Sequence, residues 1–229
     1  MGDRDMSRQL TSGVLGRKKI LPVMEGLVLY YSANRQKDAD ILIDLSGNKI
    51  NANPKGVNKA DLIENEYNGS KTLRFNGNTN YITDQFDEIS QPNTVIFVGK
   101  NEELGDLSFV YDGVDGFRHV AYQAANSVWL FGAGIYPAPP PFPARSDNTN
   151  LMLSLCEFNT DSSKYYENNV LRYVQNWGTE SLKAIIIGSR FSDTQFMNGD
   201  ISEFIVYNRL LTNEERDIIS NFLMQKYNL

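Results

Sequence analysis

The sequence predicts an all-β, antiparallel β-sandwich that carries one short helix at its C-terminal end. Two observations predict this fold. Short apolar or alternating segments recur at intervals of about ten to twenty residues, and turn residues rather than helical patterns separate them. A chain of 229 residues is also long enough to bury a core without cross-links, and the single cysteine, Cys156, leaves no intramolecular disulfide.

The strands are expected at runs of β-branched, aromatic and aliphatic residues. The last run is apolar on both faces after its polar start, which indicates a strand held between a second sheet and a helix. In chain order the predicted strands are residues 27–31, 72–75, 81–82, 94–98, 107–111, 119–122, 128–131, 151–155, 170–174, 184–188 and 201–207.

A capping box predicts where the C-terminal helix begins. Thr212 supplies a hydroxyl at the N-cap, and Glu215 supplies a carboxylate three residues later. The apolar stripe that follows is expected to lie against the sandwich, and it consists of Ile218, Ile219, Phe222 and Leu223.

The chain divides into an extended N-terminal arm, residues 1–24, and a domain over residues 25–229. The arm shows neither alternation nor helical periodicity and is basic, so we expect it to make subunit contacts. A proline-rich loop over 136–143 serves either as a stiff spacer or as a second contact. The residues expected at subunit contacts are Arg4, Arg8, Arg17, Lys18, Lys19, Tyr136 and Phe142.

The charge and hydropathy patterns argue against several classes of partner. The net charge of −6 would repel a nucleic-acid backbone. No run approaches the roughly 20 apolar residues that a membrane helix needs. The sequence shows no signal peptide, which favours a protein made or assembled in a cytoplasm.

Three segments resemble the laminin-G-like, concanavalin-A-like lectin jelly-roll superfamily. The opening strand is followed by the turn D-L-S-G-N over 44–48, and L-R-F-N-G-N over 73–78 precedes the strand at 81–82. The most specific match is G-D-I-S-E-F-I-V-Y-N-R-L-L-T over 199–212, followed by the helix and a closing Tyr227. The resemblance implies a lectin-like sandwich, and it implies glycan binding or subunit binding as the activity.

Catalytic chemistry is not expected. Some proteins of this fold are glycoside hydrolases, but their signature E-x-D-x-x-E is missing here, and the acidic run at 84–88 reads as a solvated loop. His119 is the only histidine and has no G-x-S-x-G elbow beside it, so it is expected to be a satisfied strand residue. The carboxylate of Glu203 is expected to bond nearby backbone or Arg209.

Sugar binding calls for an aromatic ring that stacks on a pyranose face, with short polar groups beside it. The candidates are Tyr111, Asp112, Tyr122, Trp129, Asn126 and Trp177. No cofactor is expected other than calcium, for which Asp106, Asp112 and Asp115 are the candidate ligands. The alternative is that these residues, and likewise Asp44 with Asn48, only form turns.

The predicted function is that of a non-enzymatic, lectin-like structural or adhesion module. We expect it on a virion, most plausibly of a bacteriophage, as a capsid decoration, head fibre or tail appendage in an oligomeric assembly. Its expected partners are other virion proteins, held through the arm, and a host surface glycan. Two alternatives stay open: a glycoside hydrolase of the same fold that uses residues such as Asp112 or Glu203, and a stand-alone lectin.

Overall fold

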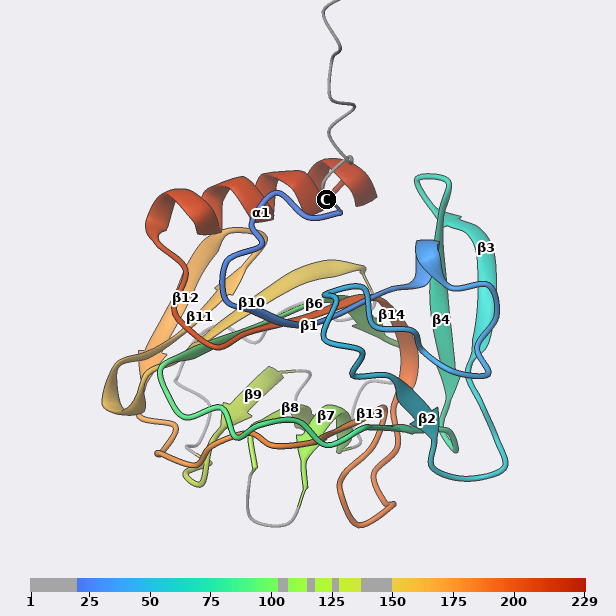
Figure 1. The fold of residues 1–229 in the computed structure, drawn as a ribbon, viewed down its shortest axis with the longest axis horizontal. Helices are drawn as coiled ribbons and strands as arrows, with labels where there is room; N and C mark the ends of the chain where they lie inside the picture. Colours follow the sequence, from blue (N-terminus) through green and yellow to red (C-terminus); the bar gives the residue numbers. More distant parts are fainter. Residues whose placement is uncertain (1–19, 103–106, 115–117, 125–127, 137–149) are drawn as a thin grey trace, which may run out of the picture.

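A computed structural model describes residues 20–102, 107–114, 118–124, 128–136 and 150–229, which form a two-sheet sandwich (Figure 1). The elements are β1 (Leu27–Ser32), η1 (Ala33–Arg35), β2 (Ala52–Pro54), β3 (Asp61–Tyr67), β4 (Ser70–Asn76), β5 (Tyr81–Thr83), β6 (Asn93–Asn101), β7 (Ser108–Gly113), β8 (Val120–Ala124), β9 (Val128–Gly132), β10 (Met152–Phe158), η2 (Thr160–Ser162), β11 (Ser163–Glu167), β12 (Val170–Gln175), β13 (Ile185–Ile187), β14 (Asn198–Tyr207) and α1 (Asn213–Tyr227).

Both sheets are antiparallel throughout their named pairings. The eight-stranded sheet runs β12-β11-β10-β6-β14-β4-β3, and β1 also pairs with β14. The long β14 borders β6 on one side, and on the other side it pairs first with β4 and then with β1. The six-stranded sheet runs β2-β5-β13-β7-β8-β9. The short β4–β5 connection therefore crosses from one sheet to the other.

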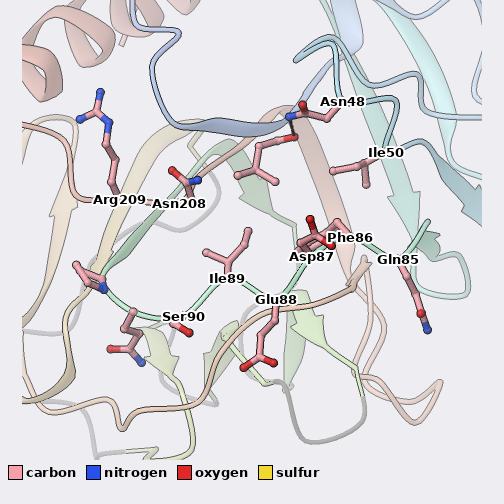
Figure 2. Close-up of a pocket in the computed structure, with 13 residues that line it drawn as sticks. Asn48, Ile50, Gln85, Phe86, Asp87, Glu88, Ile89, Ser90, Asn208 and Arg209 are labelled. Carbon is pink, nitrogen blue, oxygen red and sulfur yellow. Dashed lines mark hydrogen bonds between the residues drawn. The ribbon is translucent and has the colours of Figure 1, made fainter.

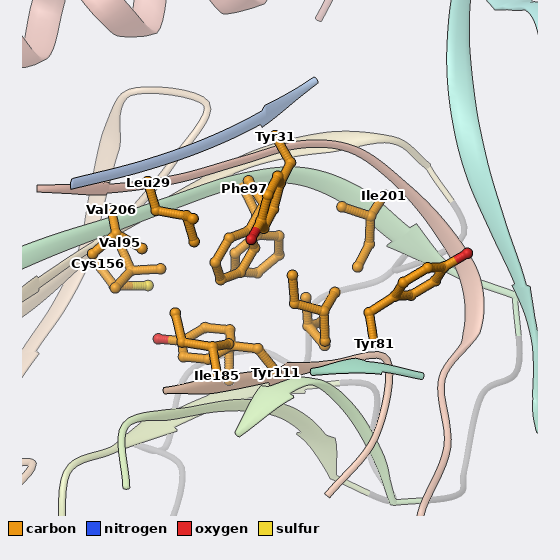
Figure 3. Packing of buried hydrophobic residues seen from close by; sticks show 14 of the residues in the cluster. Leu29, Tyr31, Tyr81, Val95, Phe97, Tyr111, Cys156, Ile185, Ile201 and Val206 are labelled. Atoms are coloured by element: carbon orange, nitrogen blue, oxygen red, sulfur yellow. The ribbon is translucent and has the colours of Figure 1, made fainter. Parts of the chain in front are cut away.

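The main core fills the space between the two sheets. Phe97 and Val206 reach it from the larger sheet, and Tyr111 and Ile185 reach it from the smaller one (Figure 3). The fully buried Cys156 belongs to this core, where burial raises the pKa of its thiol. The prediction of two antiparallel layers packed face to face is confirmed.

A second core lies between the outer face of the larger sheet and α1 (Figure 1). Ile219 and Leu223 of the helix are fully buried there. The helix begins where the capping box predicted, because the Thr212 hydroxyl accepts the backbone N–H of Glu215 at 3.2 Å. The predicted stripe is too wide, since Ile218 and Phe222 are 44% and 38% exposed.

The prediction assigned residues 1–24 to an arm, but the last of these residues pack on the sandwich. Leu21 and Val23 are buried in the second core, and the backbone carbonyl of Val23 accepts the Tyr207 hydroxyl at 2.9 Å. Residues 20–24 therefore pack on their own sandwich, which corrects the boundary. The basic residues Arg4, Arg8, Arg17, Lys18 and Lys19 lie outside the described residues.

Every predicted strand overlaps an observed one, and three strands were missed. β2 and β11 are short, and β3 (D-L-I-E-N-E-Y) is a largely exposed edge strand whose acidic residues hide its pattern. Among the described helices, none has the length and apolar character that a bilayer crossing requires.

Candidate binding site

The hollows of ligand size in the described surface include one of about 600 Å³, lined by Asn76, Gly77, Leu107, Ser108, Gln195, Phe196 and Asn198. Two others are candidate binding sites, and the larger of these two is a groove of about 820 Å³ along the crossing segment that joins β5 to β6 (Figure 2). Its lining consists of Val28, Asn48, Ile50, residues 85–92, Asn208 and Arg209.

Several polar side chains of this groove already serve the fold. The Asn48 amide donates to two backbone carbonyls of β1, and Glu88 accepts the Ser181 hydroxyl at 2.6 Å. Arg209 makes two hydrogen bonds of 2.7 Å to Glu215, and these bonds lower the pKa of the Glu215 carboxyl to about 2. The acidic run at 84–88 lies in a loop, as predicted.

The smaller hollow, called the arginine–aromatic pocket below, lies against the outer face of β7 and β8. Its volume is about 240 Å³. Alternation along β8 explains this placement, because Ala121 points into the main core while its neighbours Val120 and Tyr122 face the other way. The pocket is lined by Leu107, Phe109, Arg118, Val120, Tyr122, Tyr136, Arg190 and Gln195.

Aromatic rings form one wall of the pocket. Phe109 and Tyr122 sit on neighbouring strands and stack with centroids 5.0 Å apart and ring planes 14° from parallel. Tyr136 follows β9 and is 41% exposed, and Leu107 at the rim is 44% exposed. The wall therefore offers apolar faces on which a flat, partly apolar ligand can stack.

Arg118 is locked in place beside this wall. Its guanidinium lies 5.4 Å from the Tyr136 ring centroid and 4.8 Å from that of Phe191. Asp112 accepts two hydrogen bonds from it, at 3.2 Å and 3.0 Å, and a third at 3.1 Å from the Phe191 backbone N–H. Burial raises the pKa of the Asp112 carboxyl, and the bonds from Arg118 oppose that rise.

The loop between β13 and β14 contributes Arg190 and Gln195 to the pocket lining, and its Phe191 packs against the guanidinium groups of Arg118 and Arg190. The Asn80 amide donates to Ser189 at 2.7 Å and to Asp193 at 2.9 Å. The carbonyl of Gln195 accepts the backbone N–H of Phe109 at 3.1 Å, which ties the loop to β7. These anchors hold the side chains before any ligand arrives, which lowers the entropic cost of binding.

Tyr136 owes its position to a glycine on β9. A Cβ atom at Gly132 would lie 2.5 Å from the Tyr136 ring and 2.6 Å from the carbonyl oxygen of Ile135. Only a residue without a side chain allows the chain after β9 to fold back this closely. The exposed ring of the pocket thus depends on a strand residue that touches no solvent.

The structure corrects half of the sugar-binding candidates. Tyr111, Trp129 and Trp177 are at most 1% exposed and pack in the main core, which leaves no ring face for a ligand. Tyr122 lines the pocket, and Asp112 lies behind its wall as the anchor of Arg118. Asn126 lies outside the described residues.

The contact and metal candidates are distributed differently from the prediction. Tyr136, expected at a subunit contact, lines the pocket, and Phe142 lies outside the described residues. Asp112 bonds Arg118, and its expected calcium partners Asp106 and Asp115 are also outside them. The described residues contain no group of three acidic, histidine or cysteine side chains placed to hold a metal.

Asp44 has the turn-forming role that was predicted as the alternative to calcium binding. Its carboxylate accepts the backbone N–H groups of Tyr30, Ser46 and Ile50 at 2.9 to 3.1 Å. Because backbone N–H groups of this turn and of β1 occupy the carboxylate oxygens, turn formation explains the D-L-S-G-N pattern.

Two other buried polar residues also prove to be structural. Glu203 bonds Ser32, Lys226 and Tyr227 beneath α1, so the expectation of a backbone or Arg209 partner is wrong. His119 is fully buried just before β8, with its Nε2 at 2.6 Å from the carbonyl oxygen of Glu180 and its Nδ1 without a hydrogen-bond partner among the described residues, so the predicted satisfied strand histidine is satisfied at one ring nitrogen only.

Sequence reasoning missed Arg118, Arg190 and Gln195 as pocket residues. The pocket joins β7, β8 and the β13–β14 loop, which are far apart in sequence, so no local motif could indicate it. The adjacent pair Arg190-Phe191 was the one available signal, because an arginine beside an aromatic residue is common where cations pack on rings.

Comparisons with known proteins agree on the fold. No protein-family profile matches the chain, and no curated protein matches it significantly in sequence. Domain 4 of AbnA, a GH43 extracellular arabinanase from Geobacillus stearothermophilus solved with arabinotriose, superposes with a TM-score of 0.65 at 17% identity, over 84% of this chain and 98% of that one.

Two further structures are similar over only part of their own length. The binding domain of Paraclostridial Mosquitocidal Protein 1 has a TM-score of 0.64 at 17% identity, over 88% of this chain and 53% of that one. Trypanosoma rangeli sialidase has a TM-score of 0.61 at 16% identity, over 90% of this chain and 33% of that one. At these identities the likeness shows the fold alone, which is an antiparallel β-sandwich jelly roll.

Proposed function

We propose that this chain is a non-catalytic glycan-binding module and that the arginine–aromatic pocket is its binding site. The observation that carries the proposal is the combination of the exposed Tyr136 ring with the held guanidinium of Arg118 in one pocket. An aromatic face beside planar hydrogen-bond donors suits the apolar face and the hydroxyls of a sugar.

The comparisons support the same class of function. The arabinanase domain was solved with arabinotriose, and other structural neighbours are binding domains of toxins, one of them in complex with rat synaptotagmin II. The two carboxylates named for the hydrolase alternative also support a binding role, since Asp112 and Glu203 lie on different sheets, fully buried and ion-paired.

The test is a Tyr136→Ala variant on a glycan array, followed by titration calorimetry of the strongest hit. We expect an affinity loss of about tenfold, because a stacked ring contributes roughly 1 to 2 kcal/mol. Asp87→Ala in the groove is the matched control and should bind like the parent protein. Array binding that survives Tyr136→Ala and falls with Asp87→Ala would move the site to the groove.

Turnover on the same oligosaccharides decides between binding and hydrolysis. The proposal expects the sugar chain to stay intact after prolonged incubation with the protein, as followed by mass spectrometry. Hydrolysis that is lost in Asp112→Asn would contradict the proposal and support the enzyme alternative.

We also propose that the module belongs to a virion, as a capsid decoration, head fibre or tail appendage, with its basic N-terminal arm at subunit contacts. The support is the net charge of +3 in residues 1–20 against −6 for the whole chain. Because Leu21 and Val23 are part of the second core, the informative truncation removes residues 1–19 only. The truncated protein should stay folded and sediment as a smaller species than the full chain, whereas identical sedimentation would contradict a role of the arm in assembly.

A further inference from the structure

The charges around the arginine–aromatic pocket are not balanced within its lining. Two guanidinium groups, those of Arg118 and Arg190, line the pocket, and the described residues of its lining include no carboxylate. The fully buried Asp112 lies behind the wall and is bonded to Arg118. Glu180 lies outside the lining, where its carboxylate accepts the backbone N–H of Arg118 at 3.2 Å. The pocket is thus a positive spot on a chain whose net charge is −6.

Arg190 is the cation of the lining without a direct ion-pair partner among the described residues, although its charge is one of the influences that oppose the burial-induced rise in the pKa of the Asp112 carboxyl. Among the described residues it has no carboxylate within ion-pair distance, and its one side-chain hydrogen bond, to Gln195, is 3.5 Å long. Its Nε atom is buried without a partner, and its guanidinium lies 5.6 Å from the Phe191 ring centroid. A guanidinium that is fixed on a ring but lacks an anion is suited to pairing with a carboxylate from outside.

The size of the pocket limits the kind of ligand that can carry such a carboxylate into it. A volume of about 240 Å³ is below the roughly 300 Å³ at which sites for drug-sized ligands begin, so it suits one sugar residue. The half-buried Tyr122, which stacks on the buried Phe109, and the exposed Tyr136 offer ring faces within the same lining. A ligand that matches both features has an apolar ring face and a negative group.

We propose that the pocket selects an acidic sugar, a uronic-acid type of residue whose carboxylate pairs with Arg190 while its ring stacks on the aromatic wall. This inference rests on the proposed function and specifies its ligand. Arg118 has a positioning role here, because Asp112 already holds it. The groove in Figure 2 offers the opposite charge, since the exposed Asp87 and Glu88 line it.

The experiment compares matched ligands, methyl glucuronide against methyl glucoside, by titration with protein-observed NMR. We expect the glucuronide to bind at least about tenfold more tightly, as a charge-assisted hydrogen bond of roughly 1.5 to 3 kcal/mol implies. Arg190→Gln should abolish this preference. Arg190→Lys should keep only part of it, because lysine retains the charge without the planar fork.

The matched control is Arg172→Gln, which removes one positive charge from the β12 edge of the other sheet, where Arg172 pairs with Glu167. It should leave the preference intact, and a thermal melt verifies that each variant is folded. Equal binding of both sugars, or a preference that survives in a folded Arg190→Gln, overturns the acidic-sugar inference and leaves the glycan-binding proposal standing. If neither these sugars nor any glycan on the array binds, both proposals fail.

Discussion

The two outer faces of the sandwich solve the same electrostatic problem in different ways. Carboxylates are completely buried on both sheets, Glu203 and Asp200 on the larger and Asp112 on the smaller. On the larger sheet α1 supplies partners of Glu203, since Tyr227 donates to Glu203 at 2.5 Å and Lys226 pairs with it. On the smaller sheet Arg118 neutralises Asp112 from the same sheet's own loop.

The difference lies in what remains after the pairing. On the covered face, Lys226 pairs with Glu203, and the apolar residues pack under the helix. The other face keeps a second guanidinium, Arg190, next to exposed rings. We infer that the first face contributes stability and the second contributes recognition, so substitutions on the two faces should separate these properties.

The largest expected effect on the free energy of unfolding comes from truncating a buried side chain on the covered face. Leu223→Ala removes a fully buried side chain of the second core and should lower the free energy of unfolding by about 2 to 5 kcal/mol. Urea denaturation followed by circular dichroism measures it. Phe222→Ala, next along the same helix but 38% exposed, should cost clearly less. Glycan affinity of the folded protein should be unchanged in both, and a large loss of affinity would break the proposed division of roles.

The second prediction concerns His119, which follows the pocket residue Arg118 in the chain and stacks on the core residue Phe158. Burial lowers the pKa of this histidine from 6.5 to about 4, so the folded state disfavours its charged form. Its stabilising contribution is therefore present above pH 6.5 and is lost as the pH falls toward 4, a change on the order of 3 kcal/mol. His119→Gln should flatten the pH dependence of unfolding in this window. An unchanged slope between pH 6.5 and 4 in that variant would contradict the assignment.

The contrast between the faces also explains what the sequence could predict. The helix start at Thr212 and the strand β14 rest on local patterns, a capping box and an apolar run, and both were predicted correctly. The pocket depends on register and connecting loops, which bring Arg190 and Tyr136 into one lining that no local motif specifies. The candidates Trp129 and Trp177 failed because composition indicates which residues can stack on a sugar, whereas only packing decides which rings stay exposed.

A third prediction tests whether the exposed ring is built by its backbone. Gly132→Ala places a methyl group against the Tyr136 ring, so the segment after β9 must shift. We expect a loss of stability of about 1 to 3 kcal/mol and weaker glycan binding. Gly56→Ala is the matched control, because a Cβ there meets no atom within 4 Å. Parent-like affinity in a folded Gly132→Ala would show that Tyr136 does not need this position to bind.

The smallest expected effect is at the helix cap, where it gives the most selective test of the division between the faces. Thr212→Ala removes the hydroxyl that accepts the Glu215 backbone N–H and should cost about 1 kcal/mol of unfolding free energy. Thr212→Ser keeps the acceptor and should restore most of that loss. Because the cap lies on the covered face and touches no residue of the pocket lining, glycan affinity should match the parent in both variants. If the alanine variant binds sugar measurably less tightly while the serine variant does not, the two faces are energetically coupled through the core, and the separation of stability from recognition is wrong.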